Sequence, residues 1–374
     1  MRSISCYNAK TMENRITEVK IKGQVHKLPI FLPDATRAVT KSIDSLDMTA
    51  SNVRGAVVNT YHLMTEPGTD VLQKFGGVKD FMNYEGLVVS DSGGWQVFSL
   101  IHRSGLPGKI TDEGVTFSLG GAKDQLFSPE KSIKVQFDIG SDIIICLDDF
   151  TPPEASKAEN EATVDRTTLW AKRCKREYEN QLIKRKLSTD ERPMIFAVVQ
   201  GHKDKDLRKK SADSLKAIGF DGYGFGGYLI DESGNLDLEM SKYIADLIPS
   251  DRIKFALGFG KPWDIASLYK MGWDIFDCTL PTRDARHMRL YTFSGKPEEL
   301  DLAKRESYEL LSINRGKFVE DQSPISPYCS CHTCKNYSRA YINHLFRIKD
   351  TSAYRLATIH NLWTYNKVIE VIGS

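Results

Sequence analysis

The chain has 374 residues, 41% of them hydrophobic, and its 51 basic and 49 acidic side chains leave a formal net charge of +2. This length suits one large α/β barrel or two ordinary domains. The near balance of charge excludes binding of a polyanion through bulk charge, so a nucleic-acid partner must meet a local basic patch. No apolar run approaches the roughly 18 residues of a membrane-spanning helix, and the N-terminus lacks the apolar core of a signal peptide. We therefore expect a cytoplasmic protein without membrane association.

Eight short apolar segments recur along the chain, and stretches with helical patterns separate them. They are LPIFLP (28–33), GAVVNTYH (55–62), GLVVSDSGG (86–94), SDIIICLDD (141–149), MIFAVVQG (194–201), DGYGFGG (221–227), IKFALGFG (253–260) and DIFDCTLP (274–281). Continuous apolar runs are typical of parallel strands that helices cover. Eight of them predict an α/β fold of the (β/α)₈ TIM-barrel type.

Three segments between these strands have clear local signals. Residues 128–140 begin with Ser128 as a cap and Pro129 at the first helical position, which predicts a helix. Residues 154–187 form a second, long and highly charged helical stretch. By contrast, residues 99–127 are rich in glycine and threonine and poor in helix signal, so we expect an inserted β-hairpin there.

Polar or glycine residues follow most of the predicted strands. They are Asp91, Ser92, Gly93, Gly94, Asp148, Asp149, Gln200, Gly201, Gly226, Gly227, Gly258, Gly260 and Asp277. In a (β/α)₈ barrel the carboxyl ends of all strands converge on one face, where catalytic groups lie. Several separate strands are therefore expected to contribute to one pocket.

A cluster of metal-ligand residues lies near the C-terminus: Cys329, Cys331, Cys334 and, further along, His360. Three thiolates and one imidazole make a closed tetrahedral site of the kind that holds a structural Zn²⁺. His332 and His344 are competing candidates for the fourth ligand, and spacing alone leaves His360 only slightly ahead. We expect a barrel over residues 1–285 with the hairpin inserted, and a zinc-binding subdomain over 286–374 packed on it.

Seven segments, taken together and in order, resemble the signature motifs of the tRNA-guanine transglycosylases, the enzymes of the queuosine pathway. They are SDSGGWQVFSL (90–100), SDIIICLDDFTPP (141–153), FAVVQG (196–201), GYGFGGYLIDE (222–232), LGFGKPWD (257–264), FDCTLPTRDAR (276–286) and CSCHTCKNYSRAY (329–341). The resemblance runs from about residue 15 to about residue 370. It implies a zinc-stabilised barrel that exchanges guanine at the wobble position of the tRNA anticodon loop for a 7-deazaguanine base, usually as a homodimer.

The resemblance also implies roles for single residues. Asp277 of the FDC motif corresponds to the nucleophile that forms a covalent aspartyl-ribosyl intermediate, and Asp91 of the SDSGG motif to the general acid and base. Recognition of the base edge falls to Asp148, Gln200 and the amide of Gly227. The zinc ligands of the family match Cys329, Cys331, Cys334 and His360, so the resemblance favours His360 as the fourth ligand.

The residue types suit this chemistry. A carboxylate on the ribose face opposite the leaving base can trap an oxocarbenium-like state as a glycosyl ester. Asp277 would have this role. A second carboxylate, Asp91, would protonate the departing base and deprotonate the incoming one. The competing interpretation is that both acids cap the helices after their strands. Asp148 can accept hydrogen bonds from the N1–H and the amine of guanine, and Gln200 can serve donors and acceptors.

Further candidates surround the predicted pocket. Apolar or stacking walls are expected from Trp95, Phe150, Tyr228 and Leu257, although core packing is the competing interpretation for aromatic residues. Arg283 and Arg286 follow the nucleophile closely and are candidates for binding phosphates of the anticodon loop.

Several positions differ from the common bacterial pattern of the family, among them Phe150, His202 and Tyr228. They line or flank the base pocket there, so the incoming base stays open among preQ1, queuine and another 7-deazaguanine. Two other functions compete. A non-catalytic tRNA-binding partner subunit has no use for a nucleophile, so the presence of Asp91 and Asp277 argues against it. A transglycosylase that acts on DNA or on another tRNA position keeps the chemistry and changes the substrate.

Overall fold

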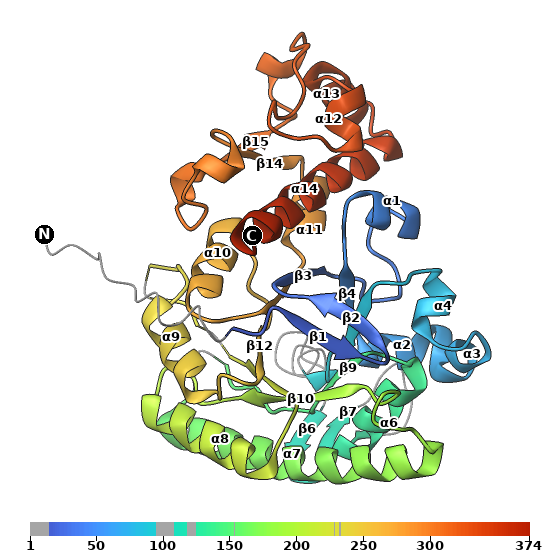
Figure 1. The fold of residues 1–374 in the computed structure, drawn as a ribbon, viewed down its shortest axis with the longest axis vertical. Coiled ribbons are helices and arrows are strands. Elements are labelled where there is room, and N and C mark those ends of the chain that lie inside the picture. The colour runs from blue at the N-terminus through green and yellow to red at the C-terminus, as the bar shows by residue number, and fades with distance from the viewer. Residues whose placement is uncertain (1–14, 95–107, 118–124, 153, 228, 232) are drawn as a thin grey trace, which may run out of the picture.

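Eight parallel strands form the centre of the fold (Figure 1), in a computed structural model that describes residues 15–94, 108–117, 125–152, 154–227, 229–231 and 233–374. In sheet order they are β3 (Ile30–Pro33), β13 (Ile275–Cys278), β12 (Ile253–Ala256), β11 (Gly222–Phe225), β10 (Met194–Val199), β9 (Ile143–Ile145), β5 (Leu87–Ser90) and β4 (Gly55–Val58). The end strands meet where Asp34 pairs with Val57 and the Ala35 amide donates to the Val57 carbonyl at 2.7 Å. The predicted (β/α)₈ barrel and its eight strands are thereby confirmed.

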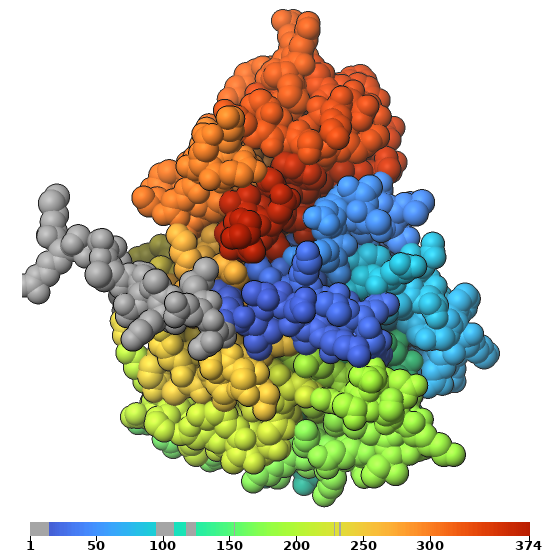
Figure 2. All heavy atoms as spheres, viewed as in Figure 1, coloured from blue at the N-terminus to red at the C-terminus, as the bar shows by residue number. Residues whose placement is uncertain are grey.

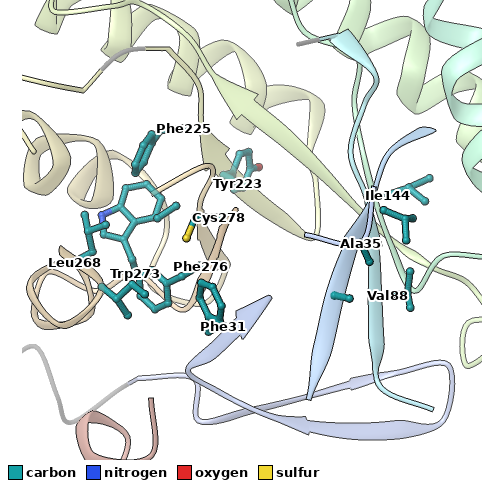
Figure 3. Packing of buried hydrophobic residues seen from close by; sticks show 14 of the residues in the cluster. Phe31, Ala35, Val88, Ile144, Tyr223, Phe225, Leu268, Trp273, Phe276 and Cys278 are labelled. Carbon is teal, nitrogen blue, oxygen red and sulfur yellow. The ribbon is translucent and has the colours of Figure 1, made fainter. Parts of the chain in front are cut away.

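Both faces of the barrel wall are buried. Alternate residues of the strands fill the interior, among them Ile30, Leu32, Leu87, Val89, Ile143, Ile145, Phe196, Val198, Ile253, Phe255 and Ile275. The residues between them point outward into a second core beneath the helices, and Figure 3 shows Phe31, Val88, Ile144 and Phe276 of that core. Because successive side chains of a strand face opposite sides, burial of both sides requires the continuous apolar runs of the sequence.

Helices surround the barrel. They are α1 (Ser45–Ala50), α2 (Thr60–Leu63), α3 (Thr69–Lys74), α4 (Val78–Met82), α6 (Pro129–Ile139), α7 (Lys157–Arg185), α8 (Lys205–Ile218), α9 (Leu238–Leu247), α10 (Pro262–Lys270) and α11 (Leu280–Arg286), with a π-helix at Met64–Gly68. The Ser128 hydroxyl accepts a hydrogen bond from the Lys131 amide at the start of α6, and a capping box of Ser156 and Glu159 starts α7. Both helices are the ones predicted at 128–140 and 154–187.

Besides an antiparallel pair of strands in the C-terminal part, the described residues form two small antiparallel sheets next to the barrel. One lies between β5 and α6 and consists of β6 (Gly108–Thr111), β7 (Gly114–Phe117) and β8 (Gln125–Phe127). The predicted inserted hairpin is present as β6 and β7, and the third strand was not predicted. The other sheet is the hairpin of β1 (Glu18–Ile21) and β2 (Gln24–Lys27), where Lys22 binds the carbonyls of Gly140 and Ser141 at 2.9 and 2.8 Å.

The chain after α11 forms the upper part of the molecule, orange and red in Figures 1 and 2. It contains the antiparallel pair β14 (Arg289–Phe293) and β15 (Tyr308–Ser312), three short 3-10 helices (297–299, 305–307 and 316–318), α12 (His332–Asn336), α13 (Arg339–Arg347) and α14 (Thr351–Ile372). Helix α14 packs against α10, α11 and β3 and also against α12, α13 and β14. Through the described part of the chain, no helix combines the length and apolar character needed to cross a bilayer.

Candidate active site

Polar side chains continue the interior rows of several barrel strands. Each lies two residues beyond a side chain of the interior core: Asp34 beyond Leu32, Asp91 beyond Val89, Gln200 beyond Val198, and Asp277 beyond Ile275. Side chains two residues apart on a strand share a face, and the carboxyl ends of barrel strands form one mouth. These four side chains therefore gather at the mouth, above the apolar filling of the barrel.

Asp277 has an unusual electrostatic environment for a carboxylate. Its side chain accepts a hydrogen bond from the Gly258 amide at 2.8 Å. Burial, and to a smaller extent the carboxylates of Asp34 and Asp91, raise the pKa of Asp277 to about 7. Negative charges exert this effect only at short range, so the three acids lie close together at the barrel mouth. The two residues predicted to do the chemistry, Asp91 and Asp277, are thus brought together.

Asp91 is held by three donors. The Asn59 side-chain amide donates to it at 2.6 Å, and the backbone amides of Thr60 and Gly93 donate at 3.0 Å each. These bonds favour the ionised form, but burial outweighs them and raises the pKa of Asp91 to about 6. A carboxyl group that titrates near neutral pH is suited to give and take a proton.

The two adjacent acids of the LDD motif have different partners. Asp148 accepts hydrogen bonds from the Ser92 hydroxyl at 3.0 Å and from the Gln200 side-chain amide at 2.8 Å, and burial raises its pKa to about 6. Asp149 instead pairs with Arg166 of α7 at 2.5 Å. Asp148 is therefore held beside Gln200 at the barrel mouth, whereas Asp149 anchors a helix.

Gly226 and Gly227 lie beside Gln200 at the end of β11. A Cβ added at Gly226 would lie 2.3 Å from Nε2 of Gln200, and Gly227 has a φ of +90°. Both positions therefore require glycine, because a side chain would displace Gln200 or strain the backbone. Leu257 is half-buried at the end of β12 and packs against Gly224.

Replacement of Gly226 by alanine should weaken binding of a ligand that depends on Gln200. We expect the KM for a base substrate to rise at least about tenfold, the effect of one lost hydrogen bond to a buried group. Steady-state kinetics of the base exchange that the resemblance implies test this. Gly316→Ala is the matched control, because a Cβ at Gly316 meets no atom within 4 Å. An unchanged KM in Gly226→Ala would contradict the importance of Gln200.

Asp34 is the functional candidate that the sequence analysis missed. It follows β3 directly and accepts a hydrogen bond from the Thr36 amide at 3.1 Å. Its charge raises the pKa of both Asp91 and Asp277. The sequence pattern that could have identified Asp34 is an acid directly after an apolar strand, the same pattern that identified Asp91 and Asp277.

Removal of the Asp34 charge should change the pH dependence of any reaction that needs ionised Asp277. In Asp34→Asn the pKa of Asp277 is expected to fall, since one of the charges that raise it is lost, and the acidic limb of the rate profile moves to lower pH. A pH–rate series in wild type and variant measures the shift. Asp190→Asn, which also removes one negative charge but on the exposed surface, should leave the profile unchanged. A shift to higher pH would contradict this assignment.

The other predicted pocket residues differ in their positions. Trp95 and Tyr228 lie outside the described residues. Phe150 is half-buried next to Asp149, and His202 has a left-handed backbone with a φ of +50°, a conformation that favours glycine. The resemblance implies glycine at the position of His202, and a left-handed backbone is one that glycine adopts readily.

The two predicted phosphate-binding arginines lie on α11. Arg283 is exposed, whereas Arg286 is half-buried and donates to the Thr282 carbonyl at 2.9 Å. Burial lowers the pKa of Arg286, and the nearby Asp34 carboxylate opposes that effect. Arg286 therefore lies close to the pocket, and Arg283 faces solvent beside it.

The four predicted metal ligands meet away from the barrel mouth. Their donor atoms all lie within 4.8 Å of one another, and the sulfurs of Cys329, Cys331 and Cys334 are 3.5, 3.8 and 3.3 Å from Nδ1 of His360. Tetrahedral zinc with ordinary bond lengths separates sulfur from nitrogen by about 3.5 Å, so the cluster fits this ion.

The surroundings of the cluster explain why His360 is the histidine that takes part. His360 is fully buried, and its Nε2 lies 2.7 Å from the Tyr291 carbonyl, which can only accept a hydrogen bond. Nε2 must therefore carry the proton, which leaves the Nδ1 lone pair for a metal. His332 and His344, the two competing candidates, are exposed and do not belong to the cluster.

The fold and site define a (β/α)₈ barrel with an acidic pocket at its carboxyl mouth and a separate Cys₃His cluster. The family model of queuine tRNA-ribosyltransferase matches residues 10–373. A queuine tRNA-ribosyltransferase of Solidesulfovibrio magneticus is 39% identical over 344 residues, which cover 91% of this chain and 85% of that protein. Those of Psychrobacter cryohalolentis and Lysinibacillus sphaericus are each 37% identical, covering 94% and 92% of this chain and 88% and 84% of theirs. The chain belongs to the queuine tRNA-ribosyltransferase family. This assignment confirms the predicted family and enzyme class, a pentosyltransferase.

Proposed function

We propose that the protein is a tRNA-guanine transglycosylase that exchanges guanine in the anticodon loop for a 7-deazaguanine base through an ester between Asp277 and the ribose. The observation that carries the proposal is that the charge of Asp91 acts on Asp277 at the barrel mouth, where both acids have near-neutral pKa values. One acid is needed on each side of the substitution at C1′, and the pocket supplies both.

The first half of the reaction breaks the bond between the base and C1′. The Asp277 carboxylate bonds to C1′ while the electron pair of the broken bond leaves with guanine, and protonated Asp91 neutralises the departing base. In the second half, Asp91 removes a proton from the incoming base, whose nitrogen attacks C1′. The ester bond breaks, and its electron pair returns to Asp277. Neither half requires an oxidant, a reductant or a metal-bound group.

Recognition of the base is assigned to the residues around Gln200. Asp148 would accept hydrogen bonds from the N1–H and exocyclic amine of guanine, a pattern that adenine lacks. Gln200 holds Asp148 at 2.8 Å and would contact the base beside it. The Gly227 amide would donate to the carbonyl oxygen of the base. Trp95, Tyr228 and Leu257 remain candidates for pocket walls.

In this proposal the tRNA phosphates and the metal bind to residues outside the base site. Arg283 and Arg286 would bind anticodon-loop phosphates next to the pocket. Zn²⁺ would be held by Cys329, Cys331, Cys334 and His360, where it stabilises the fold and takes no part in the reaction. The boundary near residue 285, the homodimer and a cytoplasmic location stay predictions.

The direct test is incorporation of radiolabelled guanine into unmodified tRNA. Wild type should exchange the label and Asp277→Ala should not. Competition with preQ1 and with queuine then identifies the incoming base, because the true substrate competes most strongly. Failure of wild type to exchange guanine would contradict the proposal and favour a non-catalytic tRNA-binding subunit. Labelling of DNA or of another tRNA position would keep the chemistry and change the substrate.

A further inference from the structure

We propose that Arg208, on helix α8, is a positioning residue that fixes the peptide between Gly226 and Gly227, so that the Gly227 N–H faces the base pocket as a ready donor. The inference rests on the proposed function, because it assigns the purine carbonyl oxygen as the acceptor. Its subject is a buried arginine for which the proposed mechanism has no other use.

Arg208 is a completely buried cation with unusual partners. Its exposed fraction is 0%, and burial lowers its pKa to about 9. Nη1 donates to the carbonyls of Val199 and Gly226 at 2.6 and 2.9 Å, and Nε donates to the His202 carbonyl at 2.8 Å. Across the residues that the structure describes, it forms no ion pair with a carboxylate. A buried charge of this kind is costly, so its bonds to two loops at the barrel mouth call for a functional explanation.

The bond to Gly226 determines where the next amide points. In a trans peptide the C=O and the following N–H lie on opposite sides. The Gly226 C=O faces Arg208, which reaches in from a helix outside the barrel wall, so the Gly227 N–H faces the opposite way, toward the mouth. In the described part of the chain this amide has no acceptor. The Gly226 amide itself donates to the Val199 carbonyl at 3.1 Å, which ties both strand ends to the same nitrogen of Arg208.

Because two glycines flank this peptide, its orientation must be fixed by a hydrogen bond such as the one from Arg208. Peptides between glycines rotate with little steric penalty, and Gly227 already has a left-handed φ of +90°. Without the guanidinium the peptide could turn over and present a carbonyl to the carbonyl oxygen of the base, which is repulsive. Nη2 of Arg208 lies 3.4 Å from the place of a Cβ on Gly227, so the guanidinium also packs against that residue.

The test compares two bases that differ in one atom. 6-Thioguanine keeps the N1–H and the amine of guanine but carries a sulfur, a weak acceptor, in place of the oxygen. Equilibrium binding of both bases to the full, zinc-containing chain is measured for wild type, Arg208→Lys and the control Arg192→Lys. Arg192 makes two bonds to Asp221 at 2.7 and 2.8 Å, next to Tyr178 and outside the mouth, so its replacement measures a structural loss alone.

Wild type should bind guanine about tenfold more tightly than 6-thioguanine, the preference expected for one good hydrogen bond. In Arg208→Lys guanine binding should fall about tenfold and 6-thioguanine binding less than about threefold, so that the preference is lost. Arg192→Lys should keep it. Equal weakening of both bases by Arg208→Lys overturns the proposal and leaves a structural role.

A second measurement needs no variant. In wild type labelled with ¹⁵N-glycine, the Gly227 amide resonance should move downfield on addition of guanine and move less with 6-thioguanine. An unchanged resonance overturns the inference even where Arg208→Lys does not fold. If wild type binds neither base, the proposed function fails as well, which distinguishes that outcome from failure of the inference alone.

Discussion

Asparagine in place of Asp277 is expected to abolish base exchange and, at the same time, to stabilise the fold at neutral pH. Without the nucleophile the rate should fall at least about 10³-fold. The pKa of Asp277 is about 7 in the folded protein, well above the value of an unfolded aspartate. The protonated form of Asp277 therefore adds fully to the free energy of unfolding in acid, and this contribution is lost as the pH rises through 7. Asparagine does not ionise, so the variant avoids this loss. Its Tm should be higher than that of wild type at pH 8 and equal to it near pH 4.

Exchange assays and thermal melts at several pH values measure both effects. Asp221→Asn is a matched control with the opposite sign. Burial alone would raise the pKa of Asp221, but the hydrogen bonds from Arg192 and the Ile195 amide and the charge of Arg192 together outweigh it and lower the pKa. This variant should therefore lose stability at neutral pH while exchange persists. Retained exchange in Asp277→Asn, or a lower Tm at pH 8, would be inconsistent with a buried nucleophile.

Loss of one cluster thiol is expected to have the second large effect. Cys331 is buried, lies in the proposed zinc cluster and accepts a hydrogen bond from the Cys334 amide at the start of α12. Structural zinc contributes on the order of 10 kcal/mol to the folding of small domains, so Cys331→Ala should lose the metal and unfold α12 and α13. Because α14 packs on both those helices and the barrel, exchange should be lost too.

Metal analysis, circular dichroism and limited proteolysis are the measurements for this variant. Cys174→Ala provides the control, since Cys174 is also buried but lies on α7, outside the cluster. It should keep one zinc per chain and lose only packing energy. A Cys331→Ala protein that retains one zinc, or that resists protease as wild type does, would exclude a structural metal at this cluster.

The barrel was predictable because burial of both faces requires continuous apolar strands, and eight of them are plain in the sequence. The hairpin β1–β2 and the strand β8 were not predicted, since strands of three or four residues are too short to give a clear periodic signal. Asp34 was missed for a different reason. An acid after a strand is most often a helix cap, and only the electrostatic coupling to Asp91 and Asp277 distinguishes it.

The resemblance to a family provided roles, and the structure added contacts that no single sequence contains. Residue type does not distinguish Asp148 from Asp149, and only the resemblance favoured Asp148. In the structure Asp148 binds Gln200 at the mouth and Asp149 pairs with Arg166. From the sequence alone, Arg208 would be expected on the surface of a charged helix, because arginine is rarely buried. Its role depends on carbonyls of two loops that are distant in sequence until the barrel forms.

The most direct test of the central claim is to trap the ester on Asp277. Protein is mixed with an unmodified anticodon stem-loop RNA, denatured rapidly, digested and analysed by mass spectrometry. Wild type should yield an RNA adduct on the peptide that contains Asp277, and Asp277→Asn should yield none. An adduct on Asp91 or Asp34, or rapid exchange with no adduct at all, would contradict the account.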